Sequence, residues 1–209
     1  MKIIEQSAEI LDKINGEEIL KKIELAGRTC YQSMDKIKPG SAAKFVAARI
    51  KAGHESILEH VSVTVRLITD RGALAELTRH RLASYSVEST RYCSYSGDVT
   101  FIWPVELWDG KENKASIKSL WRRAMEQDEN HYKALLINGC TPQEARSVLP
   151  MSTKTEIIMT ANLREWRTIF KQRCDKAAHP QMRDLMLKLL RKMSDAIPVV
   201  FDDLVDMYL

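Results

Sequence analysis

The sequence lacks the glycine-rich phosphate loop that marks many nucleotide-binding proteins. Its eight glycines are dispersed along the chain, and none of them forms a Gly-x-Gly-x-x-Gly pattern. This absence argues against a Rossmann fold, in which that pattern cradles a pyrophosphate at a helix N-terminus. Any dinucleotide would therefore be held by side chains and helix ends from several places in the chain.

Cysteine is also scarce, and its positions argue against two common uses. The four cysteines share no Cys-x-x-Cys spacing and lie far apart, at Cys30, Cys93, Cys140 and Cys174. This spacing disfavours a structural zinc site and a disulfide framework. We therefore expect four reduced thiols and no metal.

Two further absences concern location and charge. No apolar run approaches the roughly 20 residues of a membrane span, and residues 1–6 lack the apolar core of a signal peptide. We expect a cytoplasmic protein that does not bind membranes. The 32 basic and 28 acidic residues leave a net charge of only +4, far from that of a general nucleic-acid binder. A strongly positive field must come from local clustering of basic side chains.

The chain of 209 residues is long enough for one domain with a substantial core, so we expect a single domain over residues 1–209. Strands and helices do not alternate regularly, which predicts a mixed α/β (α+β) fold with long helices around a small mixed sheet. Extended patterns predict strands over 1–6, 61–69, 100–104 and 153–160. Helical spacing predicts helices over 17–30, 41–53, 71–78, 116–138, 141–149, 163–171 and 180–196, and residues 199–208 are expected to form a last short helix or a docked tail.

Two of these helices carry more detailed expectations. The helix over 41–53 is expected to begin with Ser41 as its N-cap and to stop at Gly53. His54 would then lie in a turn just past the helix end. In the helix over 180–196, the side chains expected to face inward are Met182, Leu185, Met186, Leu189 and Leu190.

Basic and hydroxyl side chains are concentrated between Arg79 and Tyr92, in a segment expected to be extended or looped. Arg79-His80-Arg81 follows the short helix over 71–78, and it is followed by Ser84, Ser86, Ser89 and Arg91. Three interpretations are open: cations that offset the dipole of a helix C-terminus, a nucleic-acid patch with stacking tyrosines, and a small-molecule phosphate site with bidentate arginines. The segment alone does not choose between them.

The longer spacing resembles that of the flavin-dependent thymidylate synthases. In that family Arg-His-Arg is followed by seven residues and a Ser, as in Arg79-His80-Arg81 to Ser89 here. Further matches lie at Gly53-His54-Glu55-Ser56 with Glu59-His60, at Glu144 to Pro150, at Asn162 to Trp166 with Arg173, and at His179-Pro180-Gln181. The five segments cover roughly residues 45–185 in the family's order, which makes the resemblance specific. It implies the fold of the flavin-dependent thymidylate synthases.

The resemblance also implies a reaction and an assembly. Members of the family make dTMP from dUMP, with 5,10-methylenetetrahydrofolate as the carbon donor and NADPH as the reductant acting through FAD. Their sites lie at subunit interfaces of a homotetramer. We therefore expect dUMP and a second copy of the chain as partners, and FAD as the cofactor.

Individual residues take roles by the same resemblance. The expected dUMP-binding residues are Glu76, Arg79, Ser89, Arg91, Arg146 and Arg173. The expected FAD-binding residues are His54, Ser56, Arg79, His80, Arg81, Asn162, Arg164 and Thr168. Arg173 is the expected catalytic residue, because the family's matching arginine faces the uracil ring, where a permanent cation stabilises charge that develops at N3.

Three positions depart from the family's pattern. Val87 stands in a spacer that often carries Asn-Glu or Gln-Glu, Thr168 stands where a His or Asn commonly meets the flavin, and Glu76 replaces a common Gln. These departures weaken individual contacts rather than the resemblance as a whole.

Two alternative functions remain open. The segment 79–95 could be the contact surface of a small RNA- or DNA-binding protein, or the chain could be a relative that binds flavin and nucleotide without turnover. Neither Ser89 nor a cysteine is an obvious nucleophile: no base neighbours Ser89 in the sequence, and Cys174, beside Arg173, is interpreted as a bystander.

Overall fold

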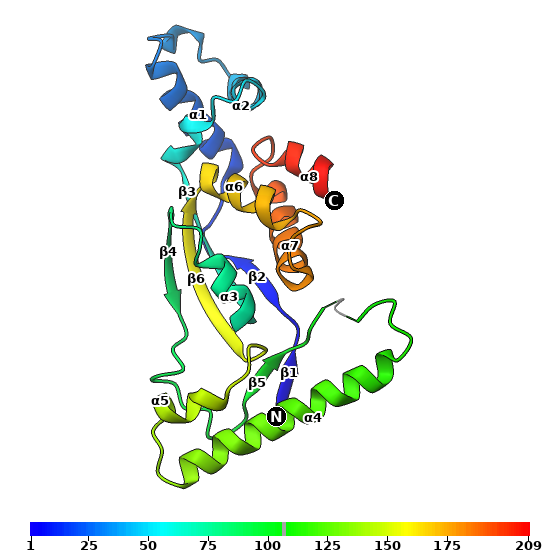
Figure 1. Cartoon of the computed structure of the whole chain (residues 1–209). Coiled ribbons are helices and arrows are strands. Elements are labelled where there is room, and N and C mark those ends of the chain that lie inside the picture. Colours follow the sequence, from blue (N-terminus) through cyan, green and yellow to red (C-terminus); the bar gives the residue numbers. More distant parts are fainter. Residues whose placement is uncertain (106–107) are drawn as a thin grey trace. The chain divides into compact units, whose positions relative to one another are not determined.

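The computed structural model describes residues 1–105 and 108–209, and it has the mixed α/β fold expected from the sequence (Figure 1). Its α-helices are α1 (Gly16–Thr29), α2 (Ser41–Lys51), α3 (Arg71–Leu77), α4 (Lys114–Ile137), α5 (Pro142–Ala145), α6 (Leu163–Arg173), α7 (Pro180–Ala196) and α8 (Asp202–Tyr208). Short 3-10 helices span Met34–Lys36, Glu55–His60 and Arg146–Val148. The strands are β1 (Lys2–Ile4), β2 (Ser7–Ile10), β3 (Ser62–Asp70), β4 (Ala83–Val87), β5 (Thr100–Ile102) and β6 (Lys154–Asn162).

The expected helices and strands are confirmed, with boundaries shifted by a few residues. β2 was not expected, and β4 lies in the segment that was expected to be extended or looped. Across both described ranges, no helix is long and apolar enough to cross a membrane.

The chain divides into two compact units, each made of three segments. Unit 1 comprises Met1–Ser7, Leu67–Arg79 and Ser86–Ile157, and unit 2 comprises Ala8–Arg66, His80–Tyr85 and Ile158–Leu209. The expected single synthase domain over residues 1–209 stays a prediction.

The main sheet has four strands in the order β2-β3-β6-β4. Backbone hydrogen bonds join Leu163 to Val61 (2.9 Å) and Arg71 to Met151 (3.0 Å), so β3 and β6 run antiparallel. Along both strands every second side chain is buried, as a strand with one covered face requires.

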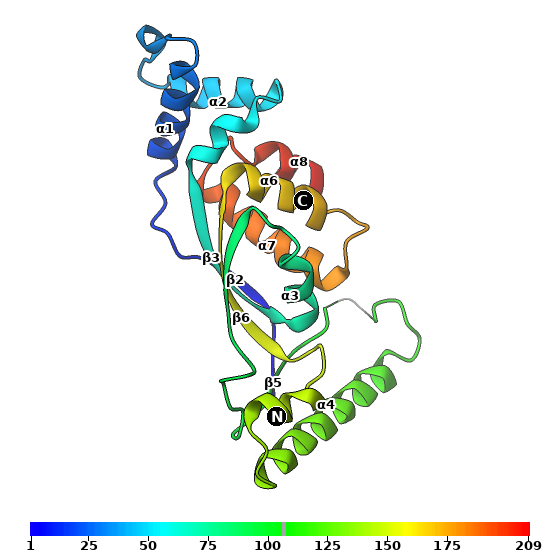
Figure 2. The same cartoon turned by 60° about the vertical axis from the view of Figure 1, so that its left-hand side comes forward.

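In unit 1, the long helix α4 lies beside the parallel pair β1–β5 in both views (Figures 1 and 2). Their contact forms a small core of Val99, Phe101, Met125, Tyr132 and Ala145. The buried Tyr132 hydroxyl accepts a hydrogen bond from the Tyr95 backbone N–H (3.2 Å). This bond anchors the irregular chain before β5 to α4.

In unit 2, α6, α7 and α8 pack together around aromatic side chains. Trp166 stacks on Phe170 with ring centroids 5.8 Å apart, and Phe170 meets Phe201 edge to face at 5.5 Å. The buried Trp166 indole donates a hydrogen bond to the Val63 carbonyl of β3 (3.0 Å), which satisfies its only polar atom. The inward face expected for α7 is confirmed, since its five apolar side chains are fully buried.

Helices α1 and α2 of unit 2 approach each other closely at Gly27. A Cβ atom at this position would lie 2.7 Å from the ring of Phe45 on α2, a distance that no side chain could keep. The expected N-cap at Ser41 is wrong by one residue, because Gly40 precedes the helix with a left-handed φ of 78°. The expected stop is confirmed, since Gly53 has a φ of 75° and His54 follows it in the next turn.

Candidate active site

The expected site residues are distributed over both units. Those in unit 1 are Glu76, Arg79, Ser89, Arg91 and Arg146. Those in unit 2 are His54, Ser56, His80, Arg81, Asn162, Arg164, Thr168 and Arg173. The residues expected at dUMP are thus in unit 1 except for Arg173, and those expected at FAD are in unit 2 except for Arg79.

In unit 1, the turn Ser89–Arg91 is tied to the short helix α5. Arg91 Nε donates to Gln143 Oε1 (2.9 Å), and its guanidinium lies over the Tyr92 ring at 5.3 Å. Ser89 Oγ accepts the Arg91 backbone N–H (3.2 Å). Arg146 comes three residues after Gln143, on the same side of a helical segment, and is exposed. The structure therefore brings Ser89 and Arg91 together beside Gln143, and it places Arg146 three residues further along the same helical segment.

Helix α5 is well defined despite its length. A capping box holds its first turn: the Thr141 side chain and the Glu144 side chain each bind the backbone of the other residue. Pro142 occupies the first helical position, where a missing N–H costs nothing. These local features fix the position of Gln143, a residue that the sequence did not single out.

The carboxylate of Glu88, the last residue of the spacer, is bound within unit 1. It accepts hydrogen bonds from the Tyr95 hydroxyl (2.5 Å) and from Lys154 Nζ (2.5 Å). Burial and the neighbouring carboxylate raise the pKa of Tyr95, so its hydroxyl remains the proton donor. Arg71 Nη2 also binds the Glu88 carbonyl (3.1 Å), and these contacts order the chain just before Ser89.

Arg79 lies past the end of α3 and is exposed. Its backbone N–H donates to the carbonyl of Glu76 (3.4 Å), which is half-buried on α3. Within the described part of the chain, the guanidinium groups of Arg79 and Arg81 have no hydrogen-bond or ion-pair partner. Both cations are therefore available to an anion.

In unit 2, His80 is buried and makes a direct contact with Arg173. Arg173 Nε donates to His80 Nε2 (3.0 Å), which therefore carries no proton, and Glu165 Oε1 lies 3.6 Å from His80 Nδ1. The Tyr85 hydroxyl donates to the His80 carbonyl (2.8 Å) and fixes the backbone there. Burial, and then the positive charge of Arg173, lower the pKa of His80 from 6.5 to about 4. His80 is therefore neutral at physiological pH.

The low pKa of His80 predicts a loss of stability in mild acid. Below pH 6.5 the unfolded chain binds a proton at this histidine and the folded chain does not, so stability is full above that pH and falls toward pH 4. We expect His80 to account for a loss of about 2 kcal/mol in the free energy of unfolding between pH 7 and pH 5. Urea unfolding at both pH values would measure it.

His80→Gln is the matched control, because glutamine offers Arg173 an acceptor but does not titrate. Glu165, whose pKa is raised by burial, changes stability in the opposite sense and is present in both proteins. The variant should therefore lose less stability on acidification than the wild type. Equal losses in the two proteins would contradict the assignment.

A pocket in unit 2 brings together three of the residues expected at FAD. It is lined by His54, Ser56 and Arg164, with Tyr31 and Arg49 among its other walls, and we call it the His54 pocket. Arg49 Nε is buried without a hydrogen-bond partner in the described ranges. Such a group is costly unless a ligand or water completes its shell.

The other residues expected at FAD have contacts inside unit 2. Asn162 Oδ1 accepts the Glu165 backbone N–H (2.8 Å) and so caps α6. Thr168 Oγ1 donates to the Arg164 carbonyl (3.2 Å), and the Arg164 guanidinium forms an ion pair with Glu59. His54 and Ser56 are exposed.

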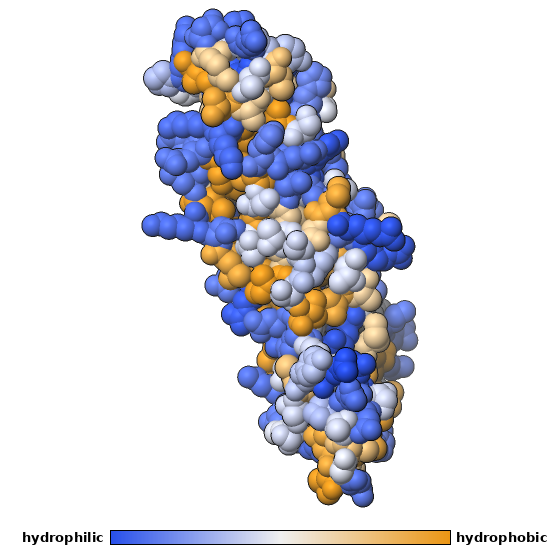
Figure 3. Space-filling model, turned by 90° about the vertical axis from the view of Figure 1, so that its left-hand side faces the viewer, coloured by the Kyte–Doolittle hydropathy of each residue, from blue (hydrophilic) through white to orange (hydrophobic). Residues whose placement is uncertain are grey.

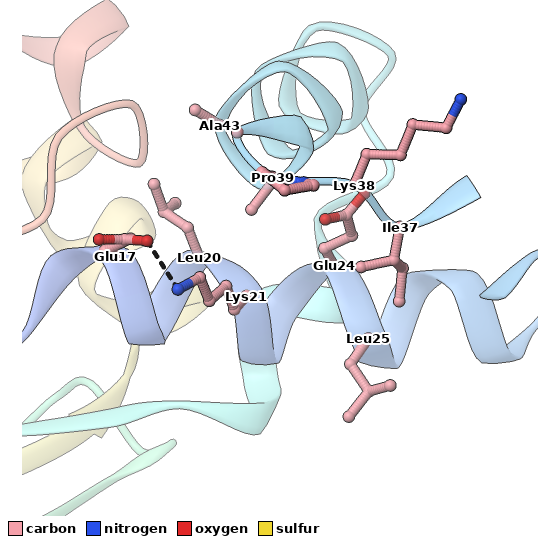
Figure 4. Close-up of a pocket in the computed structure, with 11 residues that line it drawn as sticks. Glu17, Leu20, Lys21, Glu24, Leu25, Ile37, Lys38, Pro39 and Ala43 are labelled. Atoms are coloured by element: carbon pink, nitrogen blue, oxygen red, sulfur yellow. Dashed lines mark ion pairs between the residues drawn. The ribbon is translucent and has the colours of Figure 1, made fainter. Parts of the chain in front are cut away.

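A second pocket of unit 2 contains none of the expected residues. It lies between α1 and the chain that leads into α2, and its walls are mainly apolar, including Leu20, Ile37 and Pro39 (Figure 4). Its charged rim carries the ion pair between Glu17 and Lys21 (2.6 Å). An apolar pocket of this kind offers no cluster of cations to an anionic ligand.

Sequence reasoning missed Arg49, Gln143 and Lys154. Each is a polar residue on a helix or strand, and none stands in a family motif that could have marked it. Their contacts join segments 52 residues apart (Arg91 with Gln143) or 66 residues apart (Glu88 with Lys154), which no local pattern reveals.

The structure resembles that of the UMP/dUMP methylase PolB from Streptomyces cacaoi, with a TM-score of 0.83 and 22% identity over 99% of this chain and 97% of that one. The fold is therefore shared with a nucleotide methylase. The family model for "Thymidylate synthase complementing protein" matches residues 9–199, and the chain belongs to that family.

Curated relatives support the same membership. The flavin-dependent thymidylate synthase of Geobacter sulfurreducens is 32% identical over 188 residues, which cover 87% of this chain and 80% of that protein. The enzyme of the same name from Mycobacterium avium is 35% identical over 195 residues, with 87% and 78% covered. The resemblance expected from the spacing of the motifs is confirmed.

Proposed function

We propose that this protein is a flavin-dependent thymidylate synthase, which converts dUMP to dTMP with the carbon of 5,10-methylenetetrahydrofolate and the reducing equivalents of NADPH. The family match over residues 9–199 carries the proposal. Curated relatives with this name are 32% and 35% identical to the chain. The whole chain, residues 1–209, would act as one synthase domain.

We propose that dUMP is bound by Glu76, Arg79, Ser89, Arg91, Arg146 and Arg173. The exposed, unpaired guanidinium of Arg79 supports a phosphate contact, since a planar fork binds two phosphate oxygens at once. Arg91 is held toward Gln143, and its position is thus fixed before a ligand arrives. Preorganised cations lose less entropy on binding than mobile ones.

The residues of the His54 pocket fit a flavin dinucleotide. The buried Arg49 Nε has no hydrogen-bond partner in the described ranges, and Arg164, which is paired with Glu59, lines the same pocket. Both groups suit a diphosphate, whereas the exposed Tyr31 ring offers a surface for an aromatic group. We propose that His54, Ser56, Arg79, His80, Arg81, Asn162, Arg164 and Thr168 bind FAD, which when bound would supply the hydride chemistry.

Arg173 is the proposed catalytic residue, and its environment in unit 2 supports this role. It is half-buried, and one of its donors is held by the neutral imidazole of His80 (3.0 Å). This contact orients the guanidinium, which is a permanent cation. The cation can then stabilise negative charge on the uracil ring, in surroundings where water screens it less than in bulk solvent.

We further propose a homotetramer in the cytoplasm, with sites completed at subunit interfaces. Figure 3 shows a face on which hydrophobic side chains (orange) reach the surface in separate patches among hydrophilic ones. Several large apolar residues are exposed, including Tyr31 at 72%, Leu82 at 73% and Tyr92 at 76%. Contact between subunits would remove such surfaces from water. A light-scattering mass of one chain in the presence of FAD would contradict the tetramer.

The proposed activity has a direct test. Purified protein incubated with FAD should be yellow, should bleach under NADPH, and should release dTMP when dUMP and methylenetetrahydrofolate are added. Bound flavin without dTMP would indicate an inactive relative. A colourless protein with strong, salt-dependent affinity for RNA or DNA would favour the nucleic-acid alternative, which the relatives do not support.

His54→Ala is expected to weaken FAD binding about tenfold, with little effect on dUMP affinity. The reason is that His54 lines the pocket with Arg164 and Arg49, while its removal leaves both cations in place. Titration of the apoprotein, followed by flavin fluorescence, would measure the Kd. His60→Ala is the matched control, because His60 is an exposed histidine at the end of the 3-10 helix that follows His54 and does not line the pocket. An unchanged Kd in the His54 variant would remove it from the site.

A further inference from the structure

A buried arginine of unit 2 takes no part in the proposed function. Arg167 lies on α6 and is only 1% exposed, which makes it one of the largest fully buried side chains. A guanidinium cannot lose its charge in a protein, so burial without partners would be very costly. Its contacts therefore have to be strong.

Asp203 of the C-terminal helix α8 supplies the first of these contacts. Its two carboxylate oxygens accept two hydrogen bonds of 2.7 Å from Arg167 Nη1 and Nη2, a bidentate pair. The Val200 carbonyl, just before α8, also binds Nη1. Val199 beside it has a φ of 76°, a left-handed conformation that β-branched residues rarely adopt. The turn into α8 thus holds Val199 in an unfavourable backbone conformation, and the carbonyl of the next residue, Val200, contacts Arg167.

Glu55 supplies the second contact, on the adjacent Nε–Nη2 edge of the same guanidinium. Its Oε1 lies 3.2 Å from Arg167 Nη2 and 3.3 Å from Nε, and Lys171 Nζ adds a third cationic contact at 3.4 Å. The Glu55 side chain is 17% exposed. Arg167 therefore joins Glu55 to Asp203, although 148 residues separate them in the chain.

The position of Glu55 gives this network a functional meaning. Glu55 stands between His54 and Ser56, whose side chains line the His54 pocket. Glu55 lines the same pocket, and its carboxylate contacts Arg167 and Lys171 of α6, which ties the turn to that helix. The His54 N–H also donates a hydrogen bond to the Arg49 carbonyl (2.9 Å), and the 3-10 helix Glu55–His60 that follows packs through the buried Ile57 and Leu58.

We propose that Arg167, clamped by Asp203 of α8, is a positioning residue that fixes the His54–Ser56 turn for FAD. The inference rests on the proposed flavin role of the His54 pocket. Without Asp203 the guanidinium would keep only Glu55 and the Val200 carbonyl, and it would move toward water with Glu55 following it. The turn would then present His54 and Ser56 to the ligand in a broader set of geometries, which weakens binding.

Asp203→Asn tests the proposal, because it removes the charge but keeps the shape of a side chain that is half exposed. We expect the Kd for FAD to rise about tenfold and amide exchange over residues 53–60 to become about fivefold faster without FAD. Asp203→Glu should restore most of the affinity. Asp206→Asn on the same helix is the matched control, since its carboxylate is exposed and has no partner in the described ranges.

A double-mutant cycle with Arg167→Met separates positioning from general destabilisation. If Asp203 acts through Arg167, the double variant will change the free energy of FAD binding by less than the sum of the changes in the two single variants. Suppose that the wild-type protein binds FAD and that the Asp203→Asn variant has the same FAD affinity and the same amide exchange over residues 53–60. This result would overturn the inference and leave the proposed function intact. Wild-type protein that binds no FAD would overturn the proposed function, and the inference with it.

Discussion

Replacing Arg173 with alanine is expected to lower the kcat for dTMP formation about a thousandfold, while FAD remains bound. The proposed role of this guanidinium is to stabilise negative charge on the uracil ring, and alanine offers no substitute. FAD affinity should persist because Arg173 lies on the last turn of α6 and does not line the His54 pocket. Single-turnover oxidation of reduced flavin with dUMP and methylenetetrahydrofolate would measure the chemical step.

Two further variants make this result specific. Arg173→Lys should recover only part of the activity, since an ammonium cannot keep the planar contact with His80 and face a ligand at once. Arg191→Ala on α7 removes an exposed arginine that has no partner in the described ranges, and it should leave kcat unchanged. Wild-type turnover in the Arg173→Ala protein would remove the residue from the mechanism.

Arg79→Ala is expected to raise the KM for dUMP about a hundredfold. Charge-assisted hydrogen bonds to a phosphate are worth about 1.5–3 kcal/mol each, and the exposed Arg79 guanidinium is free to form two of them. Because the phosphate lies away from the reacting ring, saturating dUMP should recover much of kcat. Initial rates over a wide range of dUMP concentration would separate the two parameters.

The control for this variant is another arginine of unit 1. Arg123 is exposed on α4 and has no hydrogen-bond or ion-pair partner among the described residues, so Arg123→Ala removes the same charge elsewhere. If both variants raise KM equally, the effect is one of net charge and not of a phosphate contact. A normal KM in the Arg79 variant would contradict the proposed contact directly.

Local signals predicted most of the fold. The capping box at Thr141–Glu144, the left-handed Gly53 and the apolar stripe of α7 each depend on residues within one or two turns, so the sequence shows them. The prediction that Ser41 is the N-cap failed because the Ser41 hydroxyl donates a hydrogen bond to the carboxylate of Glu24 (2.8 Å), 17 residues upstream. Gly40 can adopt the left-handed conformation there and so takes the flanking position.

The residues of the candidate site were predicted from spaced motifs. The contacts that these residues make with other side chains were not predicted. Motif spacing selected Arg173 and His80 separately, but only the structure shows the 3.0 Å contact between residues 93 positions apart. The lowered pKa of His80 follows from that contact and from burial, neither of which a composition reveals. Arg49 and Arg167 lie outside the motifs, and their importance comes from the buried, unpartnered Nε of Arg49 and from the contacts of Arg167 with Asp203 and Glu55.

The close approach at Gly27 has a consequence for the ligand side of unit 2. The Phe45 ring that fills the space beside this glycine also carries two guanidinium groups, Arg28 at 4.6 Å and Arg49 at 5.6 Å from its centroid. A methyl group at position 27 would displace the ring and, with it, the donor that Arg49 offers to the pocket. The missing side chain at Gly27 thus keeps the Arg49 guanidinium beside the pocket at which we propose that FAD binds.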